Sequence, residues 1–90
     1  MQFMMIENFK NNDPLPVYQR ARAEGRLTPD NLEFVDSWVD AKLGRCFQIM
    51  RCDGRALLDE WIAQWIDLVD FEVISVLSTA QVMAKLEPQL

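Results

Sequence analysis

The chain has no histidine, and Cys46 and Cys52 are its only cysteines. A zinc site usually takes four ligands, so two thiols without a histidine make a poor site, and we expect neither a metal nor a cofactor. The absence of histidine also excludes haem held by an axial imidazole and a histidine general base. The two cysteines are six positions apart on one expected strand, roughly 20 Å, which is too far for a disulfide. We interpret them as buried, inert thiols.

Long apolar runs and concentrated positive charge are also missing. No run approaches the roughly 18–20 residues that span a bilayer, and Met1 leads into a strand-like pattern without the features of a signal peptide. We therefore expect a cytoplasmic protein with no membrane partner. The formal net charge is −5, and the nearest approach to a basic stripe, Arg20, Arg22 and Arg26, is typical of a solvated helix face. Nucleic acid is therefore not an expected partner.

Short catalytic motifs are absent as well. The sequence has no Gly-rich phosphate loop, no nucleophile elbow and no Cys-x-x-Cys pair. Its 90 residues suit one small domain that buries about 60–65% of the surface of the unfolded chain. Because half of the residues are hydrophobic, a disordered tail is excluded.

What is present is a hydrophobic pattern in the order strand, helix, strand, strand, helix, strand. The expected elements are a strand over residues 2–9, a helix over 16–24, strands over 32–39 and 45–52, a helix beginning after 53–54, a strand over 70–77 and a short last helix over 79–86. This order predicts an α+β fold, a ferredoxin-like βαββαβ domain over residues 1–90. Its four-stranded antiparallel sheet would carry two helices on one face.

Turn and cap residues indicate where the elements begin and end. Asp13, Asp53 and Ser78 stand before the three helices, and their side chains are of the type that caps a helix N-terminus. Gly25 suits the position just after the first helix, and Pro88 ends the last one. The second and third strands are expected to form a hairpin with a loop of about four or five residues.

The second helix has the clearest pattern. Its apolar residues recur at helical spacing: Leu57, Leu58, Trp61, Ile62, Trp65 and Leu68. Trp61 and Trp65 lie one turn apart and could stack on a ligand. Packing in the core is the favoured interpretation, because large aromatic side chains dominate core burial.

Neither face of the expected sheet is polar. In the first strand, Met5 and Phe9 point to one side, and Met4 and Ile6 point to the other. An antiparallel sheet with one solvated face would alternate apolar and polar residues instead. Two helices cover only one face, so the other face is expected to pack against a second copy about a two-fold axis. The expected partner is therefore the chain itself, in a homodimer.

Polar side chains on the apolar strands are the candidate ligand-binding groups. If the faces that carry Met4, Cys46 and Ile74 line the barrel interior, one polar residue from each of these three strands points into it. The candidates are Asn8, Gln48 and Glu72, joined by Asp36 and Trp38 if the second strand has the matching phase. Carboxylates in such a cavity would act as general acids or bases.

Asp36 and Glu72, and a further candidate, Tyr18 on the first helix, could have a structural role instead of a ligand-binding one. Asp36 and Glu72 could instead lie on edge strands, where charges prevent mispairing, and this alternative is favoured. Tyr18 could present its phenol at the mouth of the cavity, or could pack the first helix against the sheet, with equal weight.

Three segments carry a resemblance to known proteins. They are Ser-Trp-Val-Asp at 37–40, Arg-Cys-Phe-Gln at 45–48, and the run from Asp-Glu-Trp at 59–61 through Trp65 to residue 72. With the βαββαβ order, they make the chain resemble the dimeric α/β-barrel superfamily. Within it, nearly the whole chain resembles the bacterial domain-of-unknown-function family 3303. Relatives in the superfamily include cofactor-independent monooxygenases, isomerases and haem enzymes.

Three functions follow as hypotheses. The leading one is a domain that binds a small molecule or a partner without catalysis. The alternative is a cofactor-independent monooxygenase or isomerase acting on an aromatic or enolisable substrate. In it, Trp38 and Asn8 or Gln48 would position the substrate, and Asp36 or Glu72 would take a proton. The third is a purely structural or assembly protein, which a side-chain-filled interior would favour over an open pocket.

Overall fold

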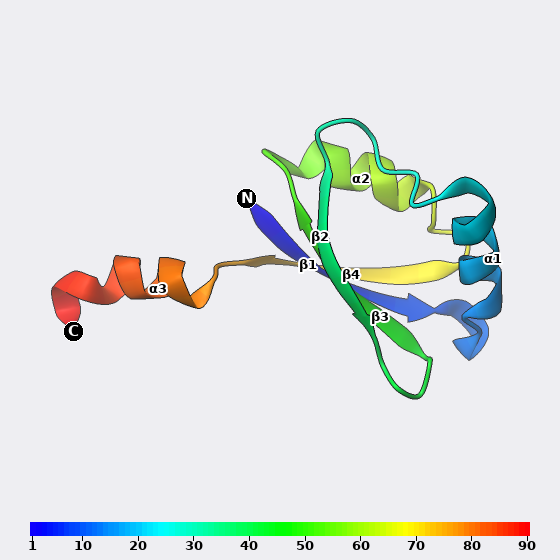
Figure 1. The fold of residues 1–90 in the computed structure, drawn as a ribbon, viewed down its shortest axis with the longest axis horizontal. Helices are drawn as coiled ribbons and strands as arrows, with labels where there is room; N and C mark the ends of the chain where they lie inside the picture. Colours follow the sequence, from blue (N-terminus) through cyan, green and yellow to red (C-terminus); the bar gives the residue numbers. More distant parts are fainter.

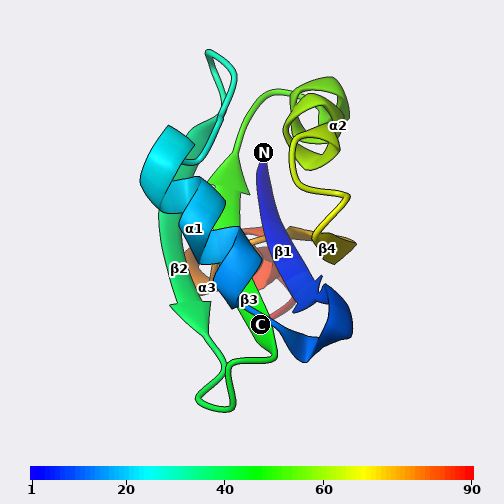
Figure 2. The ribbon, with the colours of Figure 1, turned by 90° about the vertical axis from the view of Figure 1, so that its right-hand side faces the viewer.

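In a computed structural model, which describes all 90 residues, the chain forms a four-stranded antiparallel sheet with strand order β2–β3–β1–β4. The elements are β1 (Gln2–Phe9), α1 (Leu15–Glu24), β2 (Glu33–Val39), β3 (Arg45–Arg51), α2 (Arg55–Ala63), β4 (Val69–Val76) and α3 (Thr79–Leu86), with short 3-10 helices at Lys10–Asn12 and Glu87–Gln89. Helices α1 and α2 lie over the same face of the sheet (Figures 1 and 2). The ferredoxin-like α+β architecture is therefore confirmed.

The helix ends agree with two of the predicted capping signals. Ser78 and Gln81 form a capping box at α3, with the Gln81 backbone N–H donating to Ser78 Oγ at 3.1 Å and the Ser78 backbone N–H donating to Gln81 Oε1 at 2.8 Å. Gly25 ends α1 with φ of +73°, a left-handed conformation that glycine adopts without strain.

The predicted N-cap of α2 is wrong. Gly54 occupies that position in extended backbone, and no side chain caps the helix. Because α2 begins at Arg55, Asp53 lies one residue too early to reach the free N–H groups of the first turn. At α1, Asp13 does accept from the Leu15 backbone N–H at 3.0 Å, although Pro14 is the cap residue.

The hairpin between β2 and β3 has the expected loop of five residues, 40–44. Asp40 stabilises it, since its carboxylate accepts from the Lys42 backbone N–H at 2.9 Å and from the Arg45 side chain at 3.3 Å. The pairing of β2 with β3 shifts between Phe34 and Asp36, where β2 carries an irregularity. The residues on either side of this shift therefore do not follow one simple alternation.

The core lies between the sheet and the two helices. It is formed by Phe3, Met5, Phe9, Val17, Leu32, Cys46, Met50, Cys52, Leu58, Trp61, Trp65 and Val69. Trp61 is only 2% exposed, so packing in the core is confirmed for this residue. No helix is both long and apolar enough to cross a membrane.

The opposite face of the sheet carries apolar side chains at its centre, and no helix covers it. Met4, Ile6, Phe47 and Ile49 are half-buried there, and Ile74 is exposed. Helix α3 projects away from the sheet on the side opposite α1 (Figure 1), and none of its residues is buried. One face of the sheet therefore packs within the chain and the other does not.

Candidate functional site

A pocket of about 210 Å³ lies between the sheet and helices α1 and α2. Its apolar wall includes Phe9, Val17, Tyr18, Trp61 and Trp65, and its polar groups are Glu7, Arg26, Ser37 and Gln48. A wider depression near Met1 and Arg51 is lined by polar side chains that are all exposed. The smaller pocket is therefore the one place where buried polar groups meet open space.

Glu7 and Gln48 form the polar floor of this pocket. Gln48 Nε2 donates a hydrogen bond of 2.6 Å to Glu7 Oε2. The two residues meet because both point to the helix side of the sheet, Gln48 directly opposite Met5 and Glu7 two positions further along β1. They are 9% and 4% exposed, and they are the only buried polar side chains in the chain. Gln48 Oε1 is buried and has no hydrogen-bond partner.

Burial raises the pKa of Glu7 to about 7, because the ionised carboxylate loses its water. The hydrogen bond from Gln48 and the positive charge of Arg26 act in the opposite direction and limit the rise of this pKa. Glu7 is therefore close to half-protonated at neutral pH, which suits a group that gives or takes a proton.

Arg26 lies in the loop after α1 and is held by both tryptophans of the α2 region. Trp61 Nε1 and Trp65 Nε1 donate to the Arg26 carbonyl oxygen at 2.8 and 2.9 Å. Its guanidinium lies over the Phe34 ring, 3.5 Å from the ring centroid, with Nη2 3.5 Å from Ser37 Oγ. The predicted helix face is wrong for Arg26, because α1 ends at Glu24, but the residue is exposed as predicted and borders the pocket from the loop.

Tyr18 and Gln48 are the two predicted candidates that the structure places at this pocket. The Tyr18 ring meets Phe9 edge-on, with centroids 6.1 Å apart, and nearly half of the side chain is exposed at the mouth. Burial and the nearby Cys46 and Glu7 raise the pKa of Tyr18, so its phenol stays protonated. It can therefore donate a hydrogen bond to a molecule that enters.

The other four candidates lie on the opposite face of the sheet. Trp38 pairs with Phe47 and Asp36 with Ile49 along the β2–β3 ladder, and all four candidates are exposed: Asn8, Asp36, Trp38 and Glu72. Partners in an antiparallel ladder share a face. The candidates are thus divided between two separate surfaces.

The predicted phase of β3 is therefore wrong. Gln48 pairs with Met5 and Cys46 pairs with Glu7, so neither shares a face with Met4 or with Ile74. Alternation could not fix this phase, because β3 is apolar on both sides. Asp36 and Glu72 lie on β2 and β4, the two edge strands, which agrees with the favoured structural alternative.

Sequence reasoning missed Glu7. A signal was available, since Glu7 alternates with Met5 and Phe9 and must share their face. The cysteine prediction is confirmed in its main point, because Cys46 and Cys52 are both free and buried. Burial and the charge of Glu7 raise the pKa of Cys46 to about 12, which keeps it a thiol.

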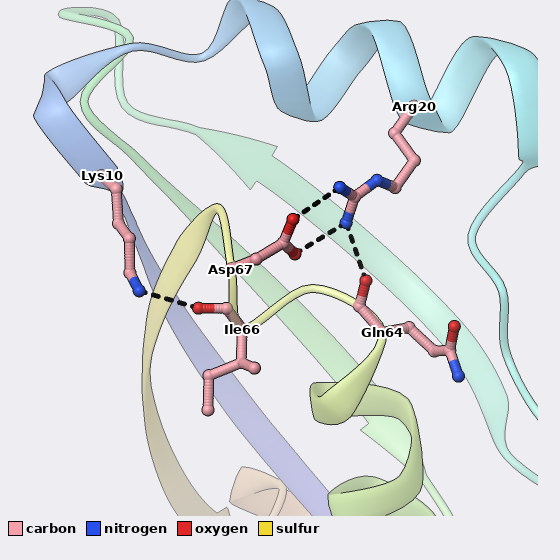
Figure 3. Close-up of polar contacts among 5 residues, drawn as sticks. All are labelled: Lys10, Arg20, Gln64, Ile66 and Asp67. Carbon is pink, nitrogen blue, oxygen red and sulfur yellow. Dashed lines mark hydrogen bonds and ion pairs between the residues drawn. The ribbon is translucent and has the colours of Figure 1, made fainter.

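A set of polar contacts holds α1 against the turn that follows α2, beside the pocket (Figure 3). Arg20 on α1 forms two parallel hydrogen bonds with Asp67, of 2.8 and 2.7 Å, and a third of 2.9 Å with the Gln64 carbonyl. Lys10 Nζ donates to the Ile66 carbonyl at 2.8 Å. These bonds tie α1 and the 3-10 helix after β1 to the turn between α2 and β4.

The structure contains no group of three or more His, Cys, Asp or Glu side chains arranged to hold a metal ion. No curated protein and no solved structure matches the chain. One family model matches it, over residues 1–90. The chain therefore belongs to the family described as a domain of unknown function, DUF3303.

Proposed function

We propose that this domain binds a small molecule in the pocket between the sheet and helices α1 and α2. The observation that carries the proposal is the buried Gln48–Glu7 pair, which lines the pocket and leaves Gln48 Oε1 without a hydrogen-bond partner. A buried polar atom without a partner costs roughly 1–3 kcal/mol. An apolar pair would fill the same space at lower cost, so the polar pair is best explained by a ligand that completes it.

The size and lining of the pocket support a small, partly apolar ligand. Its volume of about 210 Å³ is below the roughly 300–1,000 Å³ of pockets that hold drug-sized molecules. Its lining combines aromatic side chains with the hydrogen-bonded Glu7 and Gln48. This combination also argues against a purely structural role, for which a filled interior would be expected.

A fragment screen tests the proposal. Fragments that raise the melting temperature of the wild type should lose most of that effect in Gln48→Leu, which removes the amide from the pocket floor. Trp38→Ala is the matched control, because Trp38 lies on the other face of the sheet and is 55% exposed. Fragments that depend on Trp38 but not on Gln48 would place binding elsewhere and contradict the proposal.

Proton-transfer catalysis is a second candidate function, favoured by the pKa of about 7 for Glu7. In this version Glu7, rather than Asp36 or Glu72, takes the proton of an aromatic or enolisable substrate without a cofactor. Deuterium exchange into a bound ligand, followed by NMR, tests it. Exchange that is equally fast with wild type and Glu7→Gln would contradict a role for Glu7.

We further propose that the domain acts as a cytoplasmic homodimer. The uncovered apolar face supports the dimer, because a contiguous exposed patch of this kind usually marks an interaction surface. The two free cysteines support a reducing compartment. The dimer leaves the pocket accessible, since the pocket and the uncovered face lie on opposite sides of the sheet.

A further inference from the structure

Gln48 leaves one hydrogen-bond acceptor unused at the pocket floor. Its side chain is 9% exposed, and its Nε2 is committed to Glu7 Oε2 at 2.6 Å. This bond fixes the plane of the amide and leaves Oε1 without a partner. The atom that satisfies Oε1 must be a donor, so the ligand carries an O–H or N–H group.

Arg26 brings a positive charge to the same pocket and forms no ion pair there. The five ion pairs of the chain involve other basic residues, and no carboxylate lies within 4.0 Å of the Arg26 guanidinium. The side chain rests on the Phe34 ring, and its backbone is fixed by the two indole N–H groups. A carboxylate is the group that a guanidinium binds with the best geometry.

The two groups belong to the same pocket and are linked through Ser37. The Arg26 guanidinium reaches Ser37 Oγ at 3.5 Å, and Ser37 is the direct partner of Gln48 across the β2–β3 ladder. Side chains of direct partners start about 5 Å apart. A carboxylate and a hydroxyl on one benzene ring could bridge the two groups, and the ring would meet the wall formed by Tyr18 and Trp65.

Building on the pocket function proposed above, we infer that the ligand belongs to the small aromatic hydroxy-carboxylates. Its hydroxyl donates to Gln48 Oε1, its carboxylate binds the Arg26 guanidinium, and its ring packs on the aromatic wall. The volume of about 210 Å³ admits one such ring with its substituents. No covalent step is part of the inference.

Three probes separate the contributions of the two groups. NMR titrations at pH 6 would follow the indole N–H signals of Trp61 and Trp65 with 3-hydroxybenzoate, with benzoate, which lacks the donor, and with phenol, which lacks the anion. At this pH Glu7 is mostly protonated and adds no repulsion. We expect 3-hydroxybenzoate to bind with a Kd about tenfold lower than either of the other two probes.

Arg26→Gln tests the charge without disturbing the backbone carbonyl that the tryptophans bind. It should weaken 3-hydroxybenzoate and benzoate about tenfold and leave phenol unchanged. Arg22→Gln is the matched control, because Arg22 is an exposed arginine of α1 outside the pocket. It should leave the binding of all three probes unchanged.

The outcomes distinguish the ligand class from the pocket function. Equal affinities for the three probes, or an Arg26→Gln variant that keeps the preference for 3-hydroxybenzoate, would overturn the ligand class and leave pocket binding in place. Indole signals that move with none of the probes would overturn the binding function of the pocket, and the ligand class with it.

Discussion

Glu7 and Gln48 are the only polar side chains that the chain buries. At the residue scale these two side chains define the site. Glu7 is a carboxyl with a pKa near neutral pH, and Gln48 orients it through a hydrogen bond. The same pair makes folding depend on pH. The Glu7 carboxyl stays protonated to higher pH in the folded state than in the unfolded state, because burial raises its pKa from 4.5 to about 7.

The free energy of unfolding should therefore fall between about pH 4.5 and pH 7. In this window the folded state holds a proton on Glu7 that the unfolded state has lost, so rising pH favours unfolding. One pKa unit corresponds to about 1.4 kcal/mol, so the fall attributable to Glu7 is roughly 3 kcal/mol. Urea unfolding at pH 5 and pH 8 measures it.

Glu7→Gln is the matched variant for this prediction, because it keeps the shape of the side chain and removes the titrating group. The difference in stability between pH 5 and pH 8 should become smaller in the variant by about the same amount. Equal pH dependence in wild type and variant would show that Glu7 does not titrate as described.

At the scale of elements, helix α2 and the loop after α1 depend on each other. The indole N–H groups of Trp61 and Trp65 both donate to the Arg26 carbonyl. The loop after α1 is therefore held in place by α2 and the turn that follows it. Trp61 also meets Phe71 of β4 edge-on, with ring centroids 6.1 Å apart. One side chain thus joins helix, loop and sheet.

Trp61→Ala should lower the free energy of unfolding by about 3–5 kcal/mol, the usual cost of removing a buried aromatic side chain. Trp61→Phe should cost less, because it keeps one aromatic ring in the core although it loses the N–H donor and the smaller indole ring. Urea denaturation gives both values, with Leu15→Ala on the exposed side of α1 as control. A Trp61→Ala variant of unchanged stability that no longer binds ligand would make Trp61 a ligand-stacking residue.

The order of the elements and the hairpin loop could be predicted because local signals determine them. Gly25 and Ser78 mark helix ends by their own chemistry, and five residues suffice to turn one strand into the next. The end of α2 at Ala63 could not be predicted, because the apolar spacing continues through Trp65 and Leu68 in the turn that follows.

The site could be predicted only in part, for a related reason. A two-sided apolar sheet carries no polar face from which to set the phase of β3, so the sequence pattern wrongly groups Gln48 with Met4 and Ile74. The place of Arg26 at the pocket could not be predicted either, because it depends on contacts with Trp61 and Trp65, which are far along the chain. Both errors concern tertiary contacts rather than local structure.

At the scale of the whole molecule, the sheet has one covered face and one uncovered face. The molecule measures 48 × 31 × 17 Å, and α3 extends from it without burying a residue. Packing of two uncovered faces against each other would remove the exposed apolar surface from water, which is the main favourable term in association.

Sedimentation equilibrium at micromolar concentration should therefore give twice the chain mass. Ile6→Lys, on the central strand β1 within the uncovered face, should shift the mass to that of one chain because it places a charge in the contact. Leu15→Lys, exposed on the helix side, is the control and should remain dimeric. A wild-type chain that stays folded with the mass of a single chain would rule the dimer out.

The three tryptophans are distributed so that the two sides of the sheet can be observed separately by fluorescence. Trp61 and Trp65 are buried beside the pocket, whereas Trp38 is mostly exposed on the uncovered face. In a Trp38→Phe variant, all tryptophan emission would come from the pocket side and would respond to an entering ligand. In the wild type, a blue shift that depends on protein concentration would come from Trp38 as water leaves the uncovered face. Binding and assembly thus have separate optical signals within one unlabelled chain.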